Sequence, residues 1–153
     1  MSGQDRETIL KRQRTMIELF DKAPIKHTYG MVLSYDEEGR AVFDMPYNPR
    51  LDHFLGGIHG AVIATLLDNA GWFTASTYYD TWVATVEFQC RLLSPVEKVD
   101  LMSRGWMRKI GKRFAIGEME VKTRDGLLVA IGSGTFAVTT APLADRITPR
   151  EGL

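Results

Sequence analysis

The stretch from Ile58 to about Tyr79 constrains the fold of this chain most, because it is a helical segment that is apolar around nearly its whole circumference. A helix of this kind is buried, and this one is too short to cross a bilayer. We therefore expect one central helix that the rest of the chain covers. The apolar residues that define it are Val62, Ile63, Leu66, Leu67, Ala70, Trp72 and Phe73.

The segments on both sides of this helix have simpler patterns. Residues 5–21 repeat apolar side chains at helical spacing, and Pro24 ends that pattern. Residues 26–46 alternate instead, which predicts two strands joined at Glu38-Gly39. After the central helix, β-forming residues separated by turn residues predict four more strands, at 82–92, 100–109, 113–123 and 127–140.

This order of elements predicts an α+β fold, in which an antiparallel sheet buries one face by wrapping around the central helix. A length of 153 residues suits a single domain. We expect residues 1–25 to form an N-terminal helix that belongs to this domain, residues 26–141 to form its main body, and residues 142–153 to form a polar tail.

Composition excludes several functions. The formal net charge is zero, so no overall field attracts nucleic acid or an anionic membrane. Cys90 is the only cysteine, which excludes an internal disulfide and cannot by itself build a metal site. The charged N-terminus lacks the apolar core of a signal peptide, and no apolar run of about 18 residues occurs. We expect a cytoplasmic protein without nucleic-acid, membrane or metal partners.

Asp68 is the most unusual residue of the central helix, because an isolated buried carboxylate costs free energy unless it is paired, hydrogen-bonded or used in function. Pairing with a buried cation is the structural alternative to a catalytic role. The sequence alone leaves both interpretations open.

A second candidate lies where the loop becomes the central helix, at His59 between the glycines Gly57 and Gly60. Glycine leaves backbone N–H groups uncovered, and the positive end of the helix dipole adds to their pull on a carbonyl oxygen or oxyanion. The alternatives are that the glycines only make a tight turn and that His59 is a hydrogen-bonded core residue.

The spacing of these two candidates sets a condition on any enzyme. Gly60 and Asp68 are eight residues apart, which on a helix separates them by about 12 Å. Groups that act on one carbonyl must lie within about 3–3.5 Å of the reacting atoms. If both residues serve one reaction, they must come from different subunits, so the enzyme hypothesis requires at least a homodimer.

The stretch from Asn48 through His59-Gly60 to Asp68-Asn69-Ala70 resembles the hotdog-fold thioesterases of the phenylacetate-pathway (PaaI-like) branch. That signature has an Asn, then His-Gly-Gly at the helix start, then an Asp nine residues after the His, and His59 and Asp68 have this spacing. Ala61 stands in place of the second glycine. Further similarity at residues 85–88, 93–95, 108–113 and 128–138 extends the resemblance over residues 47–140.

The resemblance implies an acyl-CoA thioesterase that uses no cofactor beyond the coenzyme A portion of its substrate, and it implies a homotetramer. Asp68 would be general base or nucleophile, and the Gly60 N–H would bind the thioester oxygen with His59 shaping the turn. Asn48 would orient water or substrate. Thr85 would stand beside Asp68 and hold water through its hydroxyl.

Basic residues gather around the turn at Ile110-Gly111, and they are candidates to bind the phosphates of coenzyme A. The alternative is a solvated hairpin. The group comprises Arg104, Arg108, Lys109, Lys112 and Arg113.

Two other functions compete with thioester hydrolysis. A hotdog hydratase or dehydratase would use a loop histidine, and His53-Phe54 partly matches such a motif, but no Pro follows and Thr65 stands where the acid would be expected. A non-catalytic acyl-CoA-binding domain would lose the catalytic acid, whereas this chain keeps Asp68.

Overall fold

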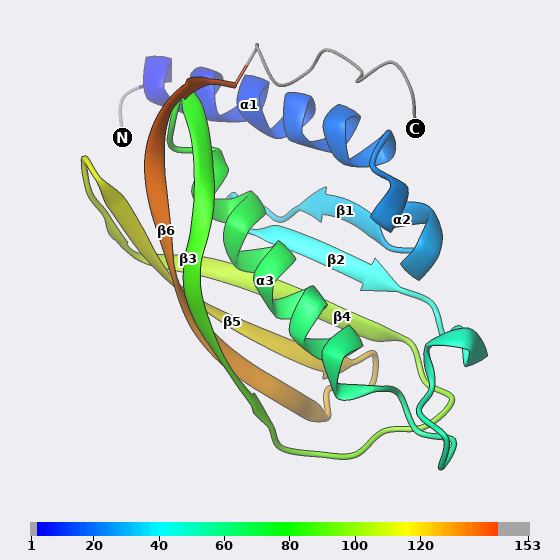
Figure 1. Cartoon of the computed structure of the whole chain (residues 1–153). Helices are drawn as coiled ribbons and strands as arrows, with labels where there is room; N and C mark the ends of the chain where they lie inside the picture. Colours follow the sequence, from blue (N-terminus) through cyan, green and yellow to red (C-terminus); the bar gives the residue numbers. More distant parts are fainter. Residues whose placement is uncertain (1–2, 144–153) are drawn as a thin grey trace.

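The computed structural model describes residues 3–143, which form a six-stranded antiparallel sheet wrapped around a long helix (Figure 1). The α+β architecture expected from the sequence is therefore confirmed. The tail expected at residues 142–153 lies outside the described residues, apart from Pro142 and Leu143. The elements are α1 (Gly3–Asp21), α2 (Pro24–Tyr29), β1 (Val32–Tyr35), β2 (Ala41–Met45), the 3-10 turn η1 (Pro49–Leu51), α3 (Gly60–Ser76), β3 (Thr81–Leu92), β4 (Leu101–Ile110), β5 (Phe114–Thr123) and β6 (Leu128–Pro142).

The strands lie in the order β1-β2-β4-β5-β6-β3, so β3 forms one edge of the sheet although it directly follows α3 in the chain. One side of β3 pairs with β6 from Leu92↔Ala130 to Thr81↔Pro142, and within the described residues no strand pairs with its other side. The opposite edge, β1, has four residues against twelve in β3. Strand β3, which carries this long open edge, also packs against α3.

One sequence expectation was wrong. The sequence predicts that residues 26–29 begin the first strand, but they belong to α2, which Pro24 begins and the cap residue Gly30 ends. Proline suits the first turn of a helix because its missing N–H would have no partner there. Gly30 has φ 71°, the left-handed conformation of a helix C-cap, and its N–H donates to Lys26 O. The two short strands start only after this cap.

The central helix lies very close to β4. A Cβ built on Gly105 would stand 2.3 Å from the carbonyl oxygen of Ala70, so only glycine permits this approach. The resulting core lies between α3 and the sheet. Its fully buried large side chains include Phe43, Met45, Leu66, Leu67, Leu101 and Met119.

Helix α1 packs against the same body and closes it on one side (Figure 1). Phe20 is 2% exposed and meets Phe43 and Phe73 edge to face, with ring centroids 5.0 and 5.4 Å away. This geometry is favourable for aromatic pairs.

No helix within residues 3–143 has both the length and the apolar character needed to cross a membrane.

Candidate active site

Asp68 lies half-buried in the middle of α3, and its carboxylate faces β3. The Thr85 hydroxyl donates a hydrogen bond of 2.9 Å to Asp68 Oδ1. Burial raises the pKa of Asp68 above its ordinary value, and the bond from Thr85 opposes that rise in part. Within residues 3–143 no cation forms an ion pair with Asp68. The structural alternative, a buried ion pair, is therefore not found in this part of the chain.

The start of α3 is capped by His59, whose side chain is exposed, so this histidine is not a core residue. Its Nδ1 accepts a hydrogen bond of 3.0 Å from the Ala61 N–H, and its carbonyl oxygen accepts from the Val62 N–H at 2.9 Å. Among the described residues no acceptor engages the N–H of Gly60. The cap therefore leaves one N–H free at the positive end of the helix dipole.

Asn48 belongs to the same end of the molecule as Gly60. Its side-chain oxygen accepts a hydrogen bond of 3.0 Å from the Arg50 N–H and so caps η1. The next turn is tied to the helix start, because the His59 N–H donates to Leu51 O at 3.0 Å. Asn48 and the free Gly60 N–H are thus held on one stiff loop.

The structure therefore divides the residues suggested by the sequence into two groups. Asp68 and Thr85 lie together at the middle of α3. Asn48, His59 and Gly60 lie at its N-terminal end, about 12 Å away by the rise of the helix. One chain holds both groups but does not bring them together.

A pocket of about 510 Å³ opens beside Gly60, between the loop before α3 and the connection from β3 to β4. A Cβ on Gly60 would stand 2.8 Å from Leu92 Cδ1, which lines this pocket. The resemblance covers residues 93–95 but gives them no role in the site, whereas in the structure they line this pocket. A sequence signal was present, because two adjacent leucines, Leu92 and Leu93, stand directly before the turn Ser94-Pro95. In the structure both leucines are exposed.

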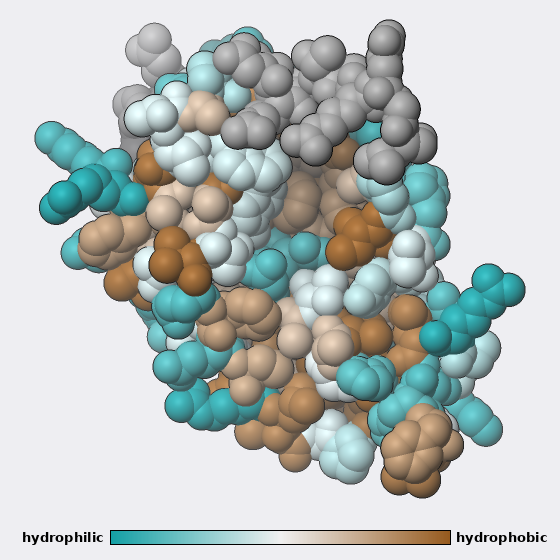
Figure 2. Space-filling view, viewed as in Figure 1, coloured by the Kyte–Doolittle hydropathy of each residue, from teal (hydrophilic) through white to brown (hydrophobic). Residues whose placement is uncertain are grey.

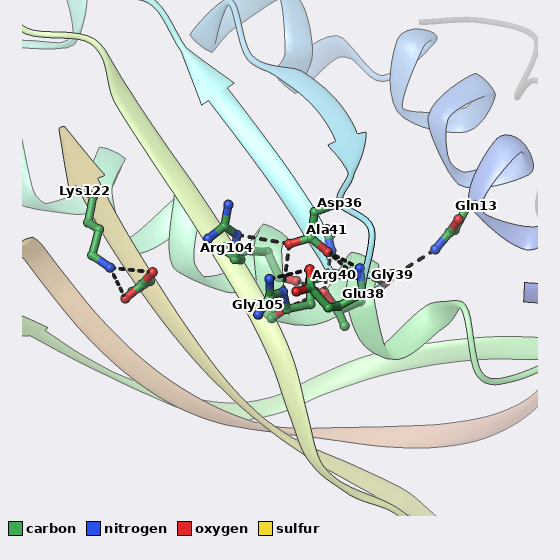
Figure 3. A network of polar contacts seen from close by, with 12 residues as sticks. Gln13, Asp36, Glu38, Gly39, Arg40, Ala41, Arg104, Gly105 and Lys122 are labelled. Atoms are coloured by element: carbon green, nitrogen blue, oxygen red, sulfur yellow. Dashed lines mark hydrogen bonds and ion pairs between the residues drawn. The ribbon is translucent and has the colours of Figure 1, made fainter. Parts of the chain in front are cut away.

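The five residues of the basic cluster do not all lie together in the structure. Arg104 lies on the strand β4, where its Nε stands 3.1 Å from Asp36 Oδ2 (Figure 3). The same carboxylate binds Arg40 at 2.7 Å. Arg108 pairs with Glu118 at 2.6 Å. Both arginines of β4 therefore already have carboxylate partners.

The other three basic residues lie at the exposed β4–β5 turn. Lys109 Nζ lies 5.0 Å from the ring centroid of Phe114, and Lys112 and Arg113 are exposed. The Tyr79 hydroxyl donates to Gly111 O at 2.8 Å, which places this turn near the C-terminal end of α3. Within one chain, the basic turn thus lies at the opposite end of α3 from Gly60.

Among residues 3–143 no cluster of three or more His, Cys, Asp or Glu side chains is arranged to hold a metal ion.

The chain is a sheet wrapped around one helix, and that helix carries a half-buried carboxylate. Comparison with known proteins identifies the class of protein to which it belongs. A family model of the thioesterase superfamily matches residues 55–130. A Saccharolobus solfataricus protein, provisionally described as an esterase, is 30% identical over 103 residues, which are 67% of this chain and 74% of that protein.

Solved structures agree with this match. A thioesterase family protein from Silicibacter pomeroyi is 26% identical, with a TM-score of 0.75 over 81% of this chain and 95% of that chain. The E. coli PaaI protein from the phenylacetic acid degradation operon has a TM-score of 0.79 over 89% of this chain and 96% of that chain. Its identity of 16% makes this a likeness of fold alone.

The chain belongs to the thioesterase superfamily and has its hotdog fold. Its class of activity is therefore hydrolysis, and membership of this superfamily supports a thioester as the bond that is cleaved.

Proposed function

We propose that this protein hydrolyses acyl-CoA thioesters, with Asp68 as the general base or nucleophile. The observation that carries the proposal is the state of this carboxylate. It is half-buried, it has a raised pKa, its one hydrogen-bond donor within residues 3–143 is Thr85, and no cation of this part of the chain neutralises it. A carboxylate with a raised pKa is a better proton acceptor near neutral pH than an ordinary one.

In the general-base form of the reaction, Asp68 takes a proton from water while the water oxygen attacks the thioester carbonyl carbon. The carbonyl oxygen becomes an oxyanion, which the free N–H of Gly60 stabilises. When the tetrahedral intermediate collapses, the C–S bond breaks and the Asp68 carboxyl returns its proton to the thiolate. The products are the free acid and coenzyme A.

Gly60 and Asp68 of one chain are too far apart for this reaction, so the site combines Asp68 of one copy with Gly60 of the partner subunit. The open edge of β3 is the surface that suits such pairing. It is twelve residues long, and Val86 on it is 63% exposed. An unpaired edge of this length is a ready template for another strand. The smallest proposed assembly is a homodimer, and the resemblance to PaaI favours a homotetramer.

Asn48 lies on the loop that carries Gly60, so in the shared site it would orient water or substrate from the partner's side. Lys109, Lys112 and Arg113 are the members of the basic cluster that no carboxylate among the described residues engages, and we assign them to the phosphates of coenzyme A. Arg108 would first have to leave Glu118.

The experiment is an assay of purified protein with acyl-CoA thioesters, in which free thiol is detected with a chromogenic disulfide. Thiol release supports hydrolysis. Hydration or dehydration would change the absorbance of a conjugated thioester without thiol release, and binding without either change would indicate a non-catalytic domain.

The shared site is tested by subunit mixing. Asp68→Asn and Asn48→Ala each damage a different half of every site in their own homodimers. After subunit exchange, each mixed dimer has one intact site, so activity should return. If the mixture stays as inactive as its components while exchange is verified by mass, the two halves do not come from different subunits.

A further inference from the structure

A second cavity, of about 230 Å³, lies between α1, α3 and the start of β3. On the face of the molecule shown in Figure 2, a recess lies below α1, with hydrophobic residues inside it and a rim of mixed hydropathy. Six apolar or aromatic side chains make most of the cavity wall: Met16, Leu19 and Phe20 from α1, Trp72 and Phe73 from α3, and Trp82 from β3.

The wall has a buried floor and a more exposed mouth. Met16 is 0% and Phe20 2% exposed, whereas Leu19, Trp72 and Trp82 are half-buried. Trp72 is held in place because its Nε1–H donates to Val83 O at 2.9 Å. Its ring lies 4.8 Å from that of Trp82, centroid to centroid. The cavity therefore has rigid aromatic sides.

This cavity lies one helical turn from the candidate catalytic carboxylate. Trp72 follows Asp68 by four residues, so the two side chains share a face of α3, with Cβ atoms about 6 Å apart. Both also contact the same strand, Asp68 at Thr85 and Trp72 at Val83. A thioester carbonyl at Asp68 thus has this cavity on its C-terminal side along α3.

The α1 wall is fastened to the rest of the domain. Arg12 Nη1 donates to Thr77 O at 3.1 Å, and Arg12 also pairs with Asp80. On the neighbouring face of α1, Gln13 Nε2 reaches Gly39 O at 3.5 Å (Figure 3). Since these contacts hold α1 at both the end of α3 and the β1–β2 turn, the depth of the cavity is fixed by the fold.

We propose that this cavity receives the distal end of the acyl group and that α1 sets an upper limit on acyl size. The inference rests on the proposed function, in which the thioester carbonyl lies at Asp68, one helical turn from Trp72 in the cavity wall. A dry cavity of about 150 Å³ accommodates a benzene ring. The cavity beside Trp72 thus accommodates an aromatic ring or a short branched chain, and a long fatty acyl chain exceeds it.

The kinetic test compares acetyl-, hexanoyl-, benzoyl- and palmitoyl-CoA in two variants that change the cavity in opposite directions. Met16→Ala deepens it and should raise kcat/KM for palmitoyl-CoA relative to hexanoyl-CoA by about tenfold or more. Leu19→Phe fills its mouth and should lower kcat/KM for hexanoyl- and benzoyl-CoA relative to acetyl-CoA by a similar factor. Leu10→Ala, an exposed change on α1 outside this cavity, is the matched control and should leave all ratios unchanged.

If Met16→Ala does not fold, the test rests on Leu19→Phe, because Leu19 is only half-buried. A selectivity profile in Leu19→Phe equal to that of the wild type, with wild-type circular dichroism, would overturn the assignment of the cavity.

A binding test separates this inference from the proposed function. In Asp68→Asn with Trp106→Phe, the remaining tryptophans are the two that line the cavity. The probe ω-bromohexanoyl-CoA should quench their fluorescence, because bromine at the chain end would lie beside them, and hexanoyl-CoA should not. Quenching without hydrolysis by the wild-type protein would keep the cavity as a binding site and refute the thioesterase proposal. Hydrolysis without quenching would refute the cavity assignment alone.

Discussion

The Thr85 hydroxyl donates a hydrogen bond of 2.9 Å to Asp68 Oδ1, and this bond joins the edge strand β3 to the middle of α3. Strand β3 therefore orients the carboxylate, and the side of β3 that faces away from β6 has no partner strand within residues 3–143. In the proposed dimer, pairing at this edge would bring the partner subunit to the side of α3 that carries Asp68. Assembly and positioning of the catalytic carboxylate would then depend on one strand.

Replacing Asp68 tests its chemical role. Asp68→Asn keeps the shape of the side chain and removes the proton acceptor, so kcat should fall by about a hundredfold or more. The measurement is the rate of thiol release at saturating acyl-CoA. Asp44→Asn is the matched control, since Asp44 lies on β2 at a half-buried position away from α3. Equal turnover in Asp68→Asn and the wild type would contradict the role of Asp68.

The same variant has a predictable effect on stability. Burial raises the Asp68 pKa in the folded chain above the ordinary value of 3.8, so the contribution of this group to stability is fully present below that value. The contribution is lost as pH rises through the raised pKa. Asparagine has no such loss. Measured by thermal unfolding, the Tm of Asp68→Asn relative to the wild type should therefore increase from acid to neutral pH, and a flat difference would show that the pKa is not raised.

Thr85 should control the pH dependence of the reaction. Its hydrogen bond lowers the Asp68 pKa, so Thr85→Val should raise that pKa further and move the acid side of the kcat/KM profile to higher pH. Loss of a hydrogen bond to a charged group should also reduce kcat by about tenfold or more. Thr85→Ser keeps the hydroxyl and should keep the wild-type profile. A pH profile in Thr85→Val that overlies the wild type would exclude this coupling.

The open edge of β3 should be required for assembly. Val86→Lys places a charge on that edge, which disfavours pairing with another strand, and should yield monomers with little activity. Val32→Lys is the matched control, because Val32 is 52% exposed on the opposite edge strand β1. Sedimentation velocity and the thiol assay measure the two outcomes. A fully active monomer would contradict the shared site.

The close approach of α3 to β4 predicts a large effect on folding from a single methyl group. Gly105→Ala would place Cβ against Ala70 O and should lower the free energy of unfolding by about 3 kcal/mol, the upper end of the usual cost of overpacking. Ser103→Ala on the same strand removes a buried hydroxyl without a hydrogen-bond partner among the described residues, and it should leave stability equal or slightly higher. Urea unfolding compares the two. Equal stability of Gly105→Ala and the wild type would mean that α3 and β4 can move apart without lowering the free energy of unfolding.

Sequence patterns predicted the architecture because periodicity reports which faces of an element are buried. The apolar circumference of residues 58–79 predicted the central helix, and alternation with turn residues predicted all four strands after it. The error at residues 26–29 has a local cause. A six-residue helix is too short to show helical periodicity, and only its Pro24 and Gly30 signals marked it.

The sequence by itself determined the spacing of the candidate site. Asp68 stands nine positions after the helix cap His59, and this spacing separates the two halves whatever surrounds them, because helix rise is a local property. Tertiary structure decided which groups meet. It brought Thr85 to Asp68 from seventeen residues away, took Arg104 to Asp36 and out of the basic turn, and built the cavity between α1 and Trp72. Such contacts depend on how elements pack across the sheet, and no periodicity within one segment reports that packing.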